Sequence, residues 1–292
     1  MKLYLLLVLI QVLFGVNFSA SKLILFKLDP FMWSNIRFLS AGLILGAFSF
    51  ILRRPHPKLD RHFWLPLIPL SLLGMGLGQS LFLFGLKQTT SVNTAVISTF
   101  IPLLTVLIVI LRGQEKMNVT KFLGIFISFI GVVGLRKIED FSLSSATMMG
   151  DLFVLGGCLS FAIYLVFAKK FIVRYDNLWT TSYMFIVSGL FFLAFNFNRL
   201  HLLNGIEFTQ IELGCMIYSI IGATVLTYFL NNIALSKLES SNVSLFVYIQ
   251  PIIAFFFGWY FLGEKVDLRI LVCSVLIFQG IYLSNLKIFK SN

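Results

Sequence analysis

Ten long apolar runs are the feature that most constrains what this sequence can fold into. They are separated by short loops and cover residues 3–21, 31–52, 64–86, 92–111, 119–135, 150–170, 178–197, 212–235, 243–262 and 269–286. A helix of about 20 apolar residues is long enough to cross a hydrocarbon core of about 30 Å. Charged residues make up 12% of the chain, whereas a soluble domain has about 25%. We therefore predict an all-α membrane protein with about ten transmembrane helices.

The apolar runs do not show the alternating polarity of barrel strands. Backbone polar groups in lipid must be satisfied internally, so a spanning segment is either a helix or part of a closed barrel. The continuous runs favour helices. The longest polar stretch between them is 198–211, and its own Leu and Ile residues lead us to expect that it lies at the membrane interface.

The first run resembles a signal peptide, because Lys2 precedes it. It continues, however, from Leu3 to Ala20, and Phe18 would occupy the −3 position of a cut after Ala20. A cleavage site requires a small residue there. We therefore expect this run to be the first transmembrane helix.

The net charge of +11 is explained by membrane topology rather than by nucleic acid as a partner. Cytoplasmic loops of membrane proteins collect Lys and Arg. If the N-terminus lies in the cytoplasm, the cytoplasmic side carries 14 Lys and Arg residues and the opposite side carries 8. Arg37 is left out of this count because it lies within the second run. We predict that both termini are cytoplasmic and that the lipid bilayer surrounds the chain.

Cysteine and histidine residues give no sign of a metal or cofactor site. Cys158, Cys215 and Cys273 each stand alone within an apolar run, and the three histidines are scattered in loops. Isolated cysteines of this kind are typically packing residues. We expect neither a metal nor a cofactor.

The chain repeats itself in two halves. A shift of 149 residues superposes Pro102 on Pro251 and also aligns Asn93 with Asn242, Glu115 with Glu264 and Lys116 with Lys265. A shift of 147 residues aligns Phe14 with Phe161, Lys22 with Lys169, Asp29 with Asp176, Phe38 with Phe185 and Gly42 with Gly189. Internal repeats of this kind determine the fold. We predict two five-helix repeats, at 1–140 and 147–292.

Five is an odd number, so the second repeat must enter the membrane in the opposite orientation to the first. Inverted repeats related by a two-fold axis in the membrane plane are typical of transporters that work by alternating access. The alternative is a duplication that serves as a scaffold and moves nothing.

Several short motifs lie at corresponding places in the runs. They are Phe14-Gly15-Val16-Asn17-Phe18, Asp29-Pro30 with Arg37-Phe38, Gln114-Glu115-Lys116, Gly263-Glu264-Lys265, Gly150-Asp151, Ser160-Phe161-Ala162, the prolines Pro102 and Pro251, and the glycines Gly124, Gly131 and Gly280. Together they resemble the drug/metabolite transporter superfamily, in its ten-helix EamA-type branch. Phe14 replaces the more usual Trp, and Gln114 replaces a Gly. The resemblance implies a basket-like bundle with a central cavity, located in a bacterial inner membrane.

Two prolines lie inside predicted helices. Pro102 and Pro251 each remove one backbone hydrogen bond and free a carbonyl group. Each position is a hinge or, equally, a kink that serves packing. Glu115 and Glu264 follow these two helices, and we expect them to cap the next helix, where the positive end of its dipole lies.

Ionisable groups are rare within the runs. Arg37 is the strongly charged residue well inside one, and we expect it to snorkel to the interface rather than to bind an anion. No Asp, Glu or His lies near the centre of a run. Proton-coupled carriers use such groups as relays, so facilitated efflux or exchange is favoured.

Neutral polar and aromatic residues near the centres of the runs are the candidates for a substrate site. Buried amides are costly in lipid unless they face partners or water. For each residue, bonding between helices remains the alternative to substrate binding. The predicted substrate-binding residues are Phe14, Asn17, Gln79, Ser98, Phe100, Tyr164, Tyr228, Asn232, Tyr248 and Gln250, and a wider set includes Gln11, Phe82, Phe161 and Asn231.

The leading hypothesis is a secondary transporter of a small metabolite such as an amino acid or a related amphipathic compound. Its outward direction and its substrate class follow from the resemblance, and we expect a monomer or a homodimer. One alternative is a membrane enzyme, but the runs lack recurring acids, bases or metal ligands near the interface. A non-transporting scaffold is the other alternative, and it leaves the inverted duplication without a purpose.

Overall fold

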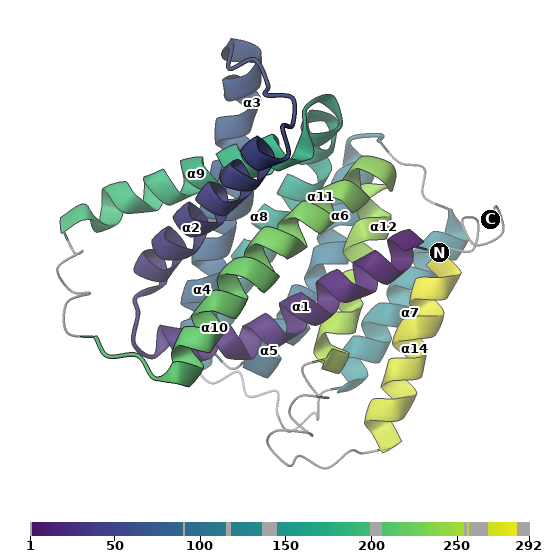
Figure 1. Cartoon of the computed structure of the whole chain (residues 1–292). Helices are drawn as coiled ribbons and strands as arrows, with labels where there is room; N and C mark the ends of the chain where they lie inside the picture. Colours follow the sequence, from purple (N-terminus) through teal and green to yellow (C-terminus); the bar gives the residue numbers. More distant parts are fainter. Residues whose placement is uncertain are drawn as a thin grey trace.

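The computed structural model describes residues 2–89, 91–114, 118–135, 145–198, 206–253, 256 and 268–284, and these form helices and connecting turns (Figure 1). The helices, with the π-helical and 3-10 segments marked η, are α1 (Lys2–Leu25), α2 (Pro30–Ile51), α3 (Arg61–Ser71), η1 (Leu72–Leu77), α4 (Gly78–Gln88), α5 (Ser91–Ser98), α6 (Phe100–Leu111), α7 (Val119–Leu135), α8 (Ser145–Arg174), α9 (Asn177–Asn196), α10 (Gln210–Ile220), η4 (Ile221–Leu226), α11 (Thr227–Lys237), α12 (Ser240–Leu245), η5 (Phe246–Ile249) and α14 (Leu268–Ser284).

Seven helices in the described part of the chain are long and apolar enough to cross a membrane: Leu3–Leu25, Pro30–Ile51, Arg61–Gln88, Thr94–Leu111, Met148–Arg174, Asn177–Ala194 and Gln210–Lys237. Val119–Gly134 and Val275–Ser284 are shorter apolar helices. The structure therefore confirms an all-helical membrane fold. Much of the predicted run 243–262 lies outside the described residues, so the count of ten helices stays a prediction.

Two of these long helices contain a π-helical segment at the same place in each half. Leu72–Leu77 joins α3 to α4, and Ile221–Leu226 joins α10 to α11. The two segments are 149 residues apart, which is the shift found in the sequence. Single π-turns inside α-helices occur frequently at functional sites. Gly78 and Gln79, which follow the first segment, and Tyr228, which follows the second, line the cavity described below.

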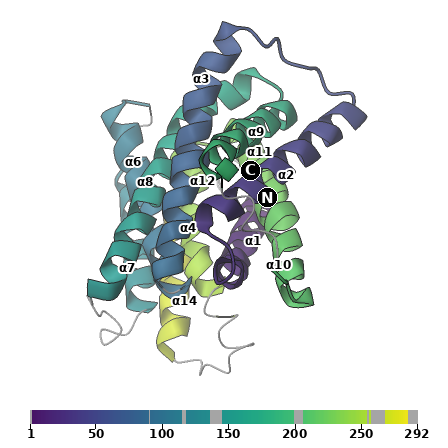
Figure 2. The same ribbon diagram turned by 90° about the vertical axis from the view of Figure 1, so that its left-hand side faces the viewer.

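Helices α2 and α9 lie side by side and make reciprocal contacts (Figures 1 and 2). The Asn35 side chain donates to the Gly189 carbonyl at 3.0 Å, and the Ser182 hydroxyl donates to the Gly42 carbonyl at 2.7 Å. Adding 147 to 35 and 42 gives 182 and 189. Each half thus presents the same two positions to the other, which is the contact pattern of a two-fold axis.

Helices α7 and α14 pack closely at Gly124 and Gly280. A Cβ atom added to Gly124 would lie 2.5 Å from the Gly280 carbonyl oxygen, and one added to Gly280 would lie 2.4 Å from the Gly124 carbonyl oxygen. Small residues allow membrane helices to pack backbone against backbone in this way. A larger side chain at either position would force the two helices apart.

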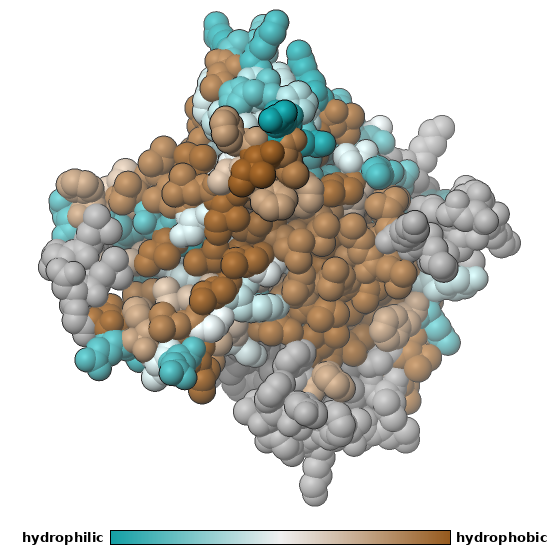
Figure 3. Space-filling view, viewed as in Figure 1, coloured by the Kyte–Doolittle hydropathy of each residue, from teal (hydrophilic) through white to brown (hydrophobic). Residues whose placement is uncertain are grey.

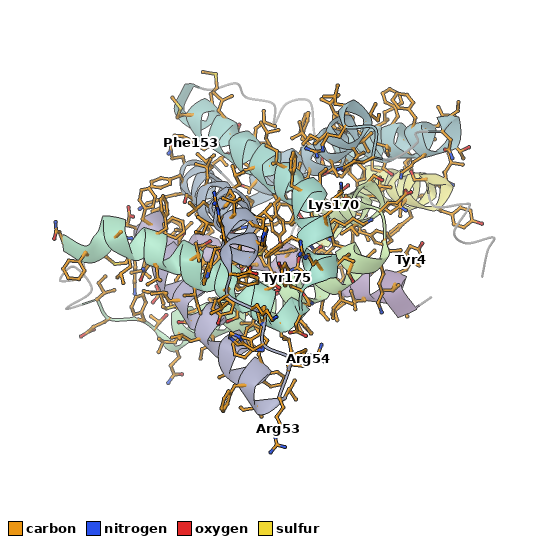
Figure 4. All side chains as sticks on the ribbon, turned by 90° about the horizontal axis from the view of Figure 1, so that it is seen from above. Tyr4, Arg53, Arg54, Phe153, Lys170 and Tyr175 are labelled. Atoms are coloured by element: carbon orange, nitrogen blue, oxygen red, sulfur yellow. The ribbon has the colours of Figure 1, made fainter. Side chains whose placement is uncertain are left out.

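Three ion pairs in the described part of the chain join helix ends and loops that the alternation of helices places on a common side of the membrane. Arg54 pairs with Asp176 at 2.8 Å and Lys121 pairs with Glu239 at 2.6 Å, and both pairs lie on the predicted cytoplasmic side. Lys27 pairs with Glu212 at 2.7 Å on the opposite side. Figure 4 shows Arg53 and Arg54 just after the end of α2, and Lys170 and Tyr175 at the end of α8. The contacts fit the predicted alternation.

The visible surface separates into apolar and polar zones. Apolar side chains cover the middle of the face in Figure 3, whereas hydrophilic residues gather at the top, around the segment between α2 and α3, and at the lower left, near the start of α10. Leu5, Phe26 and Phe50 are among the large apolar side chains that are exposed. A surface of this kind suits lipid rather than water.

Candidate functional site

A cavity lies among helices from both halves. Its empty space is about 710 Å³, including the opening to solvent. The lining combines five amides, one arginine and several aromatic rings, and consists of Gln11, Phe14, Asn17, Phe18, Arg37, Gly78, Gln79, Phe82, Ser98, Ile101, Gly157, Cys158, Phe161, Leu165, Tyr228, Asn231, Val243, Ser244, Val247 and Gln250.

The centre of the cavity lies close to the axis that relates the halves. The Gln79 amide donates to the Tyr228 hydroxyl at 2.8 Å, and the two residues are 149 positions apart. Phe14 and Phe161, which are 147 positions apart, both meet the Tyr228 ring edge-on, with centroids at 5.9 and 6.2 Å. Equivalent residues can contact a common group only near the axis itself. The cavity is therefore shared by the two halves.

Both prolines lie where a helix is interrupted beside the cavity. Pro102 follows the break between α5 and α6 at Thr99, and Pro251 follows the 3-10 segment Phe246–Ile249. Proline cannot bond to the carbonyl four residues earlier, which here belongs to Ser98 or to Val247. These two residues line the cavity, as do Ile101 and Gln250. Movement at these breaks stays a prediction, and Glu115 and Glu264 lie outside the described residues.

Two hydrogen bonds hold amides of α1 in the cavity wall. The Gln250 amide donates to the Gln11 side-chain oxygen at 2.6 Å, while its own side-chain oxygen has no hydrogen-bond partner. The Asn17 side-chain oxygen accepts from the Ser219 hydroxyl at 2.8 Å. These contacts link α1 to the second half of the chain.

Arg37 is buried, with 1% of its surface exposed, so the expectation that it snorkels to the interface is wrong. Its Nε donates to the Thr224 hydroxyl, and its Nη2 donates to the Ala223 carbonyl at 3.3 Å. Both partners belong to the π-helical segment Ile221–Leu226. This segment covers the arginine and supplies acceptors to it, so the side chain stays inside the bundle.

Six of the ten predicted substrate-binding residues line the cavity, namely Phe14, Asn17, Gln79, Ser98, Tyr228 and Gln250. The other four lie elsewhere. Phe100 is 37% exposed and packs edge-on against Phe129. Tyr248 is fully buried outside the lining.

Tyr164 and Asn232 belong to a network between helices. The Tyr164 hydroxyl donates to the Asn232 side-chain oxygen at 2.9 Å, and the Asn232 amide donates to the Thr181 hydroxyl at 2.9 Å. This chain joins α8, α11 and α9. For these two residues, the structure favours bonding between helices.

The cavity residues outside the ten predicted ones include Asn231, which belongs to the wider set, Cys158 and Arg37. The sequence carries a signal for the first two. Asn231 and Asn232 lie three and four residues after Tyr228, so helical spacing places both on the face of the tyrosine and points to Asn231 as well as Asn232. Cys158 is the equivalent of Gln11 under the shift of 147. Arg37 gave no such signal, because its surroundings come from a distant segment.

The sequence profile of the EamA-like transporter family matches residues 1–136 and again residues 148–286. An uncharacterized transporter of Archaeoglobus fulgidus is 29% identical over 289 residues, covering 98% of both chains. The uncharacterized transporter YoaV of Bacillus subtilis is 23% identical over 275 residues, covering 94% of both chains. A crystal structure with 14% identity has a TM-score of 0.77, covering 98% of this chain and 96% of the other, and has the same fold.

Proposed function

The chain belongs to the EamA-like transporter family, and from this premise we propose that it is a secondary transporter that moves a small amphipathic metabolite, such as an amino acid or a related compound, by alternating access. The cavity close to the axis between the halves is the observation that carries this proposal. A site shared by two related halves can be opened to either side by the same rocking movement.

The reciprocal contacts support a division into two inverted repeats at 1–140 and 147–292. Asn35 and Ser182 exchange equivalent hydrogen bonds across the crossing of α2 with α9. Gly124 and Gly280 do the same with backbone contacts at the crossing of α7 with α14. The equivalent rings of Phe38 and Phe185 also stack across the first crossing, with centroids 5.5 Å apart. Both crossings therefore place equivalent positions against each other.

The mode of transport is proposed from the charges near the cavity. No Asp, Glu or His is among the described residues that line it. Proton-coupled carriers normally place an ionisable relay within the membrane. We therefore propose export or exchange without coupling to a buried carboxylate, in a bacterial inner membrane with both termini in the cytoplasm.

Counterflow in proteoliposomes tests this function. Purified protein is reconstituted and loaded with radiolabelled amino acids, nucleotide-like metabolites or cationic dyes, with and without a pH gradient. We expect exchange of at least one amino acid or related compound and no requirement for the gradient. Gln250→Ala should weaken the exchange, whereas Gln210→Ala, an exposed amide outside the cavity, should leave it unchanged.

Absence of flux for every class in a folded preparation would overturn the transporter proposal. A strict requirement for a pH gradient would keep the transporter but overturn the proposed uncoupled mode.

A further inference from the structure

Among the described residues that line the cavity, Arg37 is the one with a charged side chain. No carboxylate of the described residues pairs with it. Asp176, Glu212 and Glu239 are paired with other cations. A buried charge without a partner is strongly unfavourable, and in a membrane protein it marks a functional site. The cavity lining thus carries one positive charge, and no carboxylate among the described lining residues balances it.

The hydrogen bonds of the guanidinium leave one nitrogen free. Nε and Nη2 are held by Thr224 and Ala223, whereas Nη1 has no hydrogen-bond partner. Arginine donates from all three nitrogens, and its bonds to an ionised oxygen are among the strong hydrogen bonds in proteins. The two contacts with the π-helical segment keep the side chain at the cavity.

We propose that the transported molecule carries a single carboxylate group, which binds to Nη1 of Arg37. This proposal rests on the proposed transport function and names the substrate class. Arg37 supplies one positive charge and its Nη1 one nitrogen without a partner. These match the single negative charge of a carboxylate and one of its oxygens. A phosphate group carries a charge of about −1.5 to −2 at neutral pH, and the described lining offers no second cation to balance it.

The remaining lining fits the rest of such a molecule. The Asn231 amide nitrogen is an unpartnered donor and the Gln250 side-chain oxygen is an unpartnered acceptor. Phe14 and Phe161 provide an apolar wall. The cavity therefore suits a small carboxylic acid with an apolar portion and a further polar group.

The second half of the chain supplies a matched substitution for the test. Under the shift of 147, the equivalent of Arg37 is Met184, a fully buried residue that does not line the cavity. Methionine is long, unbranched and uncharged, so R37M removes the charge while filling a similar space. R54M is the control, since Arg54 lies outside the cavity and pairs with Asp176.

Thermal unfolding in lipid nanodiscs tests the binding. The probes are acetate, 3-phenylpropionate, the neutral 3-phenylpropanamide, the cationic 2-phenylethylamine and phenyl phosphate, at constant ionic strength. We expect the two carboxylates to raise the unfolding temperature of the wild type and of R54M, and the amide and the amine to leave it unchanged. In R37M, the apparent affinity for the carboxylates should fall at least tenfold, and R37K should restore part of it.

Three results would overturn the proposal: equal stabilisation by the amide or the amine, unchanged carboxylate binding in R37M, or no stabilisation of the wild type by either carboxylate. Stronger binding of phenyl phosphate than of 3-phenylpropionate would indicate a substrate with a phosphate group and would contradict the carboxylate. Counterflow separates this proposal from the transport function. If carboxylates bind in a manner that depends on Arg37 but no flux is seen, the transport function alone is contradicted. If cations are transported and R37M leaves that flux intact, the carboxylate proposal alone is contradicted.

Discussion

Lys22 in the first half and Lys169 in the second make the same contact. Lys22 donates to the Leu86 and Thr89 carbonyls, each at 2.6 Å, just where α4 ends. Lys169 donates to the Leu238 carbonyl at 2.6 Å, just where α11 ends. Lysine commonly satisfies the last carbonyls of a helix, which have no partner within the helix. The two halves hold these helix ends in the same manner.

The helix starts also match between the halves. Asp29 caps α2 and Asp176 caps α9, each by accepting a backbone N–H two residues later. Asp60 caps α3 and Thr209 caps α10 in the same way, three residues later. Such caps are typically worth about 1 kcal/mol each. The scaffold is therefore symmetric at both ends of its helices.

The cavity, in contrast, differs between the halves. Gln11 corresponds to Cys158, Arg37 to Met184, and Gln250 to Ile101. A small molecule close to the axis has no symmetry of its own, so the two halves must offer it different groups. The comparison leads us to propose that symmetric positions mainly hold the helices together, whereas asymmetric positions distinguish one end of the substrate from the other. Each prediction below tests one side of this division.

The largest effect is expected at the symmetric crossing of α7 with α14. Gly124→Leu and Gly280→Leu should each destabilise the protein by about 3 kcal/mol or more, at the upper end of the cost of overpacking, because the new side chain meets backbone atoms. Thermal or denaturant unfolding of the purified variants measures this. Gly214→Ala is the control, since a Cβ there meets nothing within 4 Å. A clear difference between the two leucine variants would argue against the symmetry.

A smaller loss is expected when the lysine contacts are removed. Lys22→Met and Lys169→Met should each cost about 1.5 kcal/mol of unfolding free energy, the lower end for a hydrogen bond to a charged group. Lys22 contacts more carbonyls, so its loss should be the larger. The same unfolding assay compares the pair with Lys58→Met, an exposed residue of the α2–α3 connection. If neither variant differs from that control, these contacts do not hold the helix ends.

The smallest change in stability is expected within the cavity, where binding changes instead. Tyr228→Phe removes one neutral hydrogen bond with Gln79 and should weaken substrate affinity by about two- to tenfold, the equivalent of about 0.4–1.4 kcal/mol. Counterflow at varied substrate concentration measures this. Tyr164→Phe is the matched control, because that hydroxyl binds Asn232 outside the cavity. The opposite result, with affinity lost in Tyr164→Phe and kept in Tyr228→Phe, would move the site away from this cavity.

Much of the site could be predicted because two simple rules apply in lipid. Amides within a membrane must find partners or water, so Asn17, Gln79 and Gln250 were selected, and the structure places all three in the cavity. The same rule selected Asn232, which bonds to Tyr164 and Thr181 instead. The rule identifies buried polar groups, but it does not distinguish a partner on another helix from a ligand.

Hydropathy and the internal shifts of 147 and 149 residues determined the helical membrane fold and the expected two-fold relation, because lipid permits few spanning structures and duplicated sequences pack alike. Only the tertiary structure decided which polar groups share the cavity. Arg37 shows the reason. The π-helical segment that buries it is 186 residues away in sequence, at Ala223, and the way in which that segment packs against α2 left one nitrogen without a partner. Such a contact depends on the packing of distant helices, and no local pattern encodes it.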